Sequence, residues 1–142
     1  MAKKVSKSKP KAQYAWVYSP TVTAADKIRI ENDFKGLIEE LKNGLKPLEV
    51  PQEMNQIVDF TTKWRGNNFY IIQKFKCPED GNYTKEGFDA PLARLEFYGL
   101  DKFNISVQQY NGQWMELPMF ANSTTEEAIQ AIKTDNWFDI FG

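Results

Sequence analysis

Alternation of apolar and polar residues between positions 57 and 117 constrains the fold of this chain more than any other feature. Five short stretches have the two-residue period of a β-strand, and they cover residues 57–64, 69–77, 93–98, 103–110 and 114–117. Turn-forming residues join several of them directly, as at Arg65–Asn68, Gly99–Lys102 and Asn111–Gly112. Connections this short cannot hold a parallel crossover, so the pattern predicts an antiparallel five-strand meander.

Two helix-forming segments flank the expected strands. Thr23–Asp26 and Ser123–Glu126 both have the spacing of a capping box, and each precedes apolar residues at helical spacing. Gly44 supplies a stop for the first helix. The sequence therefore predicts an α+β fold for residues 19–142 as a single domain, with an N-terminal and a C-terminal helix packed on one face of the sheet.

Histidine is absent from the 142 residues, and Cys77 is the only cysteine. This composition removes the usual general base, the partner that activates a serine or cysteine nucleophile, and the commonest zinc ligands. Cys77 is more simply a small buried apolar side chain than a nucleophile. We therefore expect no catalytic residues, no metal, no cofactor and no enzymatic activity.

Acidic residues gather in the polar loop expected at residues 78–90, and they are Glu79, Asp80, Glu86 and Asp89. They lack the ligand spacing of an EF-hand loop. Solvated loop carboxylates explain them better than a cation site.

No apolar region in the first twenty residues resembles a signal peptide, and no run of eighteen apolar residues occurs. These observations favour a cytoplasmic protein that does not enter a membrane.

Charge is distributed unevenly along the chain. The leader, residues 1–18, carries five lysines and no acidic residue: Lys3, Lys4, Lys7, Lys9 and Lys11. The remaining residues carry thirteen basic and nineteen acidic side chains, a net charge of −6. The leader is too polar to fold alone and is expected to be disordered. It would attract nucleic acid or a ribonucleoprotein without sequence preference, although a solubilising terminus has the same composition.

The sheet face opposite the helices is a second candidate site. The alternation predicts that this face carries six cationic or tyrosine side chains: Lys63, Tyr70, Lys74, Lys76, Arg94 and Tyr98. Tyrosines among cations on an open sheet can stack and hold single-stranded nucleic acid. Asp59 and Glu96 are expected on the same face, where cross-strand charge pairs would also keep it solvated. The other large aromatic residues are interpreted as core: Trp64, Phe75, Phe97, Trp114, Trp137 and Phe138.

Two functions remain open from the residues alone. The first is a non-enzymatic binding protein that docks on nucleic acid or a ribonucleoprotein through its basic leader. The second is a protein–protein interaction or structural assembly component, in which residues 14–18 or an exposed sheet edge add to a partner.

Residues 55–138 also carry a family resemblance. The segment Pro91–Phe97, a following alternating strand, Trp114 and a capped C-terminal helix resemble an uncharacterised bacterial domain-of-unknown-function family. The resemblance implies the same α+β fold. It implies no activity, because none is established for that family.

Overall fold

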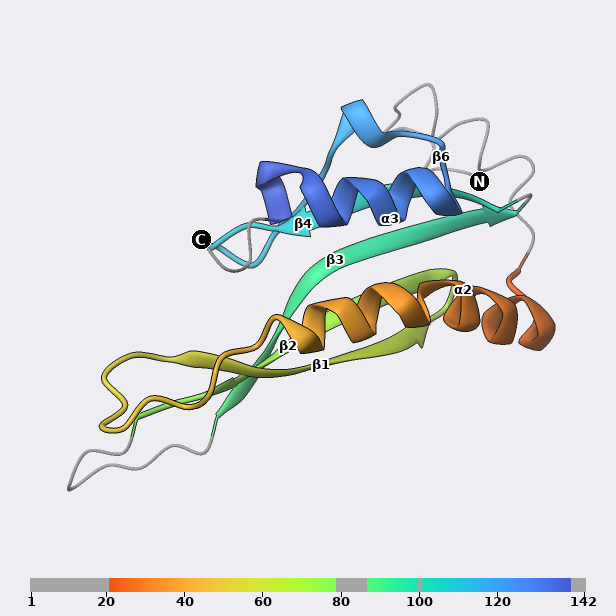
Figure 1. Cartoon of the computed structure of the whole chain (residues 1–142). Helices are drawn as coiled ribbons and strands as arrows, with labels where there is room; N and C mark the ends of the chain where they lie inside the picture. Colours follow the sequence, from red (N-terminus) through yellow and green to blue (C-terminus); the bar gives the residue numbers. More distant parts are fainter. Residues whose placement is uncertain (1–20, 79–86, 100, 139–142) are drawn as a thin grey trace.

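The computed structural model describes residues 21–78, 87–99 and 101–138 (Figure 1). Its helices are α2 (Ala24–Asn43) and α3 (Thr125–Thr134), with the 3₁₀ turns η2 (Pro118–Phe120) and η3 (Asn136–Phe138). Its strands are β1 (Gln56–Arg65), β2 (Asn68–Lys76), β3 (Phe88–Gly99), β4 (Lys102–Gln108), β5 (Trp114–Glu116) and β6 (Ser123–Thr124). The predicted α+β fold is confirmed.

The sheet runs in the order β1-β2-β3-β4-β5, and every neighbouring pair is antiparallel. This is the predicted meander. The short strand β6 adds a sixth member, which pairs with β4 through Lys102–Thr124 and Phe103–Ser123. The third strand was expected to begin near Ala93, but β3 begins at Phe88, where it pairs with Phe75 of β2.

Capping boxes start both helices. At α2, Thr23 accepts a hydrogen bond from the Asp26 N–H and donates its own N–H to Asp26, as predicted. At α3 the predicted position is wrong by one residue, because Thr124 and Glu127 form the capping box. Ser123 instead pairs in β6, and its hydroxyl donates to the Phe120 carbonyl at 2.6 Å.

Both helices lie on one side of the sheet, with α2 beside β1 and α3 beside β4 (Figure 1). Phe34 of α2 lies in the apolar layer between the helices and the sheet. The centre of its ring is 5.2 Å from that of Phe69 and 6.0 Å from that of Phe103. The buried side chains form one apolar cluster that joins both helices to the sheet. Glu40 of α2 and Lys133 of α3 also form an ion pair at 3.1 Å.

Three aromatic side chains depart from the predicted core. Phe97 and Phe138 are buried and Trp64 packs against the core, as expected. Phe75 is only half-buried and stacks on Phe88 with ring centroids 4.8 Å apart. Trp137 is 47% exposed, and Trp114 lies outside the core cluster.

Cys77 is buried and unpaired, as expected for a small apolar side chain. The structure does not describe the basic leader, which includes residues 14–18, or the last four residues of the chain. In the part that is described, no helix combines the length and apolar character needed to cross a membrane.

Candidate functional site

One row of paired residues crosses the sheet face that the helices leave uncovered. Lys63 of β1 pairs with Tyr70 of β2, which pairs with Arg94 of β3; the row continues to Ser106 of β4 and Glu116 of β5. Directly paired residues of antiparallel strands point to the same face. The sheet therefore brings Lys63, Tyr70 and Arg94 together, as the alternation predicted.

Trp114 joins these three side chains, although the sequence placed it in the core. Its indole lies with its centroid 4.5 Å from the Arg94 guanidinium carbon and 5.7 Å from the Tyr70 ring. Trp114 is on β5 and Tyr70 is on β2, so about 14 Å of sheet separates their backbones. The indole must therefore extend over β4 and β3. We call Lys63, Tyr70, Arg94 and Trp114 the open-face cluster.

Cation–π contacts hold the open-face cluster together. The Lys63 ammonium lies 5.8 Å from the centre of the Tyr70 ring, and Arg94 lies against Trp114. Arg94 also donates a long hydrogen bond from Nη2 to the Ser106 hydroxyl at 3.5 Å. Its Nε is buried and has no hydrogen-bond partner among the described residues. The guanidinium is thus fixed in position while part of its donor capacity is unused.

The other predicted residues of this face lie outside the cluster. Lys74 is neutralised by Asp89 of β3, with an ammonium–carboxylate distance of 3.1 Å. Lys76 pairs with Gln56 at the far end of β2. Tyr98 lies at a register shift near the end of β3. Burial raises the pKa of Tyr98, and the carboxylates of Glu96 and Glu116 raise it further, so its phenol stays neutral at physiological pH.

The charge on this face is divided across the sheet. Arg65 adds to the cations of β1, since it pairs with Asn68 and lies one row beyond Lys63. Glu96 is on β3 and Glu116 is on β5, at the far end of the central row. Cationic side chains of this face therefore gather over β1, β2 and the middle of β3. The five leader lysines lie outside the described residues, so the structure does not place them relative to this face.

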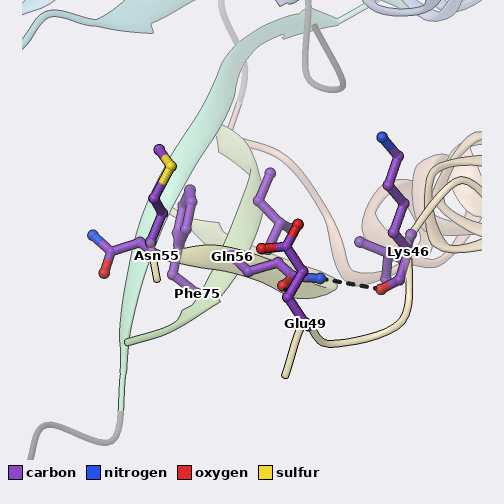
Figure 2. A pocket seen from close by; sticks show the side chains of 8 residues that line it. Lys46, Glu49, Asn55, Gln56 and Phe75 are labelled. Carbon is purple, nitrogen blue, oxygen red and sulfur yellow. Dashed lines mark hydrogen bonds between the residues drawn. The ribbon is translucent and has the colours of Figure 1, made fainter. Parts of the chain in front are cut away.

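Two adjoining hollows lie on the helix side of the sheet and share Ile57 and Phe75. Their volumes are about 340 and 380 Å³, within the range of small-molecule sites. Figure 2 shows the one that Lys46, Glu49 and Gln56 line. The amide of Gln56 is already used there: it donates to the carbonyls of Lys46 and Pro47 and accepts from the Glu49 N–H. This amide holds the loop before β1 in place, so it is not free to orient a ligand.

Metal-ligand chemistry is not assembled in the part of the chain that the structure describes. No group of three or more histidine, cysteine, aspartate or glutamate residues comes close enough there to hold a metal ion. Of the acidic loop residues considered above, only Asp89 lies within the described residues, and it pairs with Lys74.

An antiparallel sheet, two helices on one face and a cationic–aromatic cluster on the other define a small α+β domain with an open sheet surface. A family model matches residues 29–139, so the chain belongs to the family described as Domain of unknown function (DUF3024). Comparison with curated proteins and with solved structures found no match.

Proposed function

We propose that this protein is a non-enzymatic binding protein of the bacterial cytoplasm that holds single-stranded nucleic acid on its open sheet face. The observation that carries the proposal is the convergence of Lys63, Tyr70, Arg94 and Trp114 from four different strands. Aromatic rings offer stacking surfaces to any base, and neighbouring cations neutralise phosphates.

A sheet face suits an unpaired strand better than a duplex. Single-strand binders of this type place bases against side chains that stand up from the strands, and phosphates beside cations at the edge of the path. Tyr70 and Trp114 are half-buried and fixed by contact with each other, which lowers the entropy lost on binding. The lysines of residues 1–18 would add salt-dependent attraction to the same ligand.

Binding of a fluorescent 12-nucleotide single strand, measured by anisotropy at low salt, tests this proposal. Tyr70→Ala should weaken binding by about tenfold, because one stacked base contributes about 1–3 kcal/mol. Tyr70→Phe keeps the ring and should bind like the wild type. Wild-type protein that binds no single strand at low salt would refute the proposal.

The salt dependence gives a second readout of the same site. Lys63→Ala should reduce the slope of log K against log salt by about 0.7, the value for one phosphate contact on a single strand. Lys35→Ala removes an exposed lysine from the helix side and serves as the matched control. Equal slopes for the two variants would place the ligand elsewhere.

A second candidate function is assembly with a protein partner. Leu48, Val50 and Met54 are exposed in the loop before β1, and Val50 is 92% exposed. Met54 also lines the hollow that Lys46 and Gln56 line. Apolar side chains exposed within one short loop could bury against a protein partner. A strictly monomeric protein that co-purifies with no partner would count against this function.

A further inference from the structure

The hairpin between β4 and β5 carries no charged side chain. Residues 103–115 contain no charged side chain, whereas 26% of the whole sequence is charged. The tip, Gln109–Gln113, is glutamine, tyrosine, asparagine, glycine and glutamine. A surface of this kind has little attraction for phosphate, and it offers an aromatic ring and amides that can contact uncharged groups.

Tyr110 stands at this tip and is fully exposed, with a relative exposure of 102%. A single exposed aromatic residue is ordinary on a protein surface. What distinguishes Tyr110 is the rigid turn that carries it. The Gly112 N–H donates to the Gln109 carbonyl, and the Gln109 N–H donates to the Gln113 carbonyl, both at 2.8 Å.

Side chains tighten the same turn. The Gln113 N–H donates to the Asn111 carboxamide oxygen at 3.0 Å, and Gln108 Nε2 donates to the Gly112 carbonyl at 3.1 Å. Gly112 has φ +87°, which lets the chain turn without strain. Tyr110 is therefore presented on a backbone that is already ordered before any ligand binds.

Several amide groups at the tip remain available for a ligand. Gln108 uses only its NH₂ group and Asn111 only its carbonyl oxygen in the turn. The Gln113 amide makes no hydrogen bond to another described residue. Amides of this kind can donate to and accept from the edge of a nucleobase.

The tip is also continuous with the open-face cluster. Gln108 pairs with Trp114, so both lie on the open face, and Tyr110 follows Gln108 by two residues. A strand of nucleic acid that crosses the cluster toward β5 would reach the tip next.

We propose that the β4–β5 hairpin tip is a base-binding subsite, in which Tyr110 stacks on one unpaired base and the neighbouring amides contact its edge. This inference rests on the proposed function, because it extends the path of the same single strand. It assigns the tip to bases, whereas Lys63 and Arg94 contact phosphates.

Two 12-nucleotide probes test the subsite with the full-length protein: an ordinary single strand, and a strand of the same length with abasic sugars. Tyr110→Ala should weaken binding of the ordinary strand by about tenfold. The substitution should leave the slope of log K against log salt unchanged, because no charge is removed. The Tyr110→Ala protein should also bind the abasic strand as tightly as the wild type does. Tyr110→Phe should retain wild-type binding of both probes.

The outcomes separate the two proposals. If Tyr70→Ala weakens binding and Tyr110→Ala does not, the open-face site stands and the hairpin subsite is refuted. An equal loss on the abasic strand would also refute it, because base stacking would not be the cause. If the wild-type protein binds neither probe, the proposed function falls and the subsite falls with it. Since Tyr110 is fully exposed, the melting temperature of Tyr110→Ala should match the wild type and exclude unfolding.

Discussion

Thr124 fixes where α3 begins, because its hydroxyl accepts the Glu127 N–H while Glu127 accepts the Thr124 N–H. Thr124→Ala removes the first of these bonds and should lower the free energy of unfolding by about 1 kcal/mol. Thr124→Ser keeps the hydroxyl and should remain close to the wild type. Chemical denaturation of the two variants measures the difference, and equal losses would show that the methyl group, rather than the cap, stabilises α3.

Asp26 gives the first helix a pH-dependent cap. The Thr23 N–H, followed by the Arg29 guanidinium, lowers the pKa of Asp26 below its usual value of 3.8. A lowered folded-state pKa stabilises the protein above the unfolded-state pKa, and this contribution disappears as the pH falls through the folded-state value.

Asp26→Asn should therefore be less stable than the wild type at neutral pH, and the difference should shrink below about pH 4. Thermal unfolding of both proteins between pH 2 and pH 7 measures this. A difference that stays constant down to pH 2 would contradict the role of the charged carboxylate.

At the scale of elements, alanine substitutions at two glycines should change the stability of the protein in opposite directions. Gly36 lies within α2, where an added Cβ would meet nothing within 4 Å, so Gly36→Ala should stabilise the protein by about 1 kcal/mol. Gly87 precedes β3 with φ +152°, and an added Cβ would lie 2.2 Å from the Phe75 carbonyl oxygen. Gly87→Ala should destabilise by about 1–3 kcal/mol. Urea denaturation measures both, and the same sign for the two variants would contradict this account of the β2–β3 junction.

Elements whose boundaries are set by nearby residues were predictable from the sequence. Thr23 and Gly44 bound α2 because the cap bonds at each end are local. The start of α3 was missed because a distant strand decides it: Ser123 pairs with Phe103 of β4, which leaves Thr124 to cap the helix. Long-range pairing of this kind leaves no mark in the local spacing.

The residues of the candidate site also divide into those that the local sequence pattern predicts and one that it does not. Lys63, Tyr70 and Arg94 come from long strands, where alternation assigns the face. Trp114 begins a strand of three residues, too short for alternation to outweigh the general tendency of tryptophan to be buried. Leu117 could have indicated the correct face for Trp114, because Leu117 is buried in the core. Alternate residues of a strand share a face, so Met115 lies on the core side with Leu117 and Trp114 lies on the open face.

At the scale of the whole molecule, stability depends on the aromatic contacts between the helix layer and the sheet. Phe34 is fully buried and touches Phe69 of β2 and Phe103 of β4, so it connects α2 to strands in both halves of the sheet. Phe34→Ala should lower the free energy of unfolding by about 3–5 kcal/mol. The neighbouring Lys35→Ala, on the exposed side of α2, should change it little. Calorimetry or denaturant titration distinguishes the two, and a loss below 1 kcal/mol for Phe34→Ala would mean that α2 is not integral to the core.

The edges of the sheet also bear on how the protein behaves at high concentration. Beyond β4, the sheet ends in two short pieces, β5 of three residues and β6 of two. The long edge is β1, which carries a register shift at Ile57/Asp59, and there the Asp59 carboxylate accepts the Phe60 N–H at 2.8 Å. Short, bulged and side-chain-capped edges are poor templates for a strand from another molecule. The sheet can thus expose a broad face to a ligand with little tendency to grow sideways into aggregates.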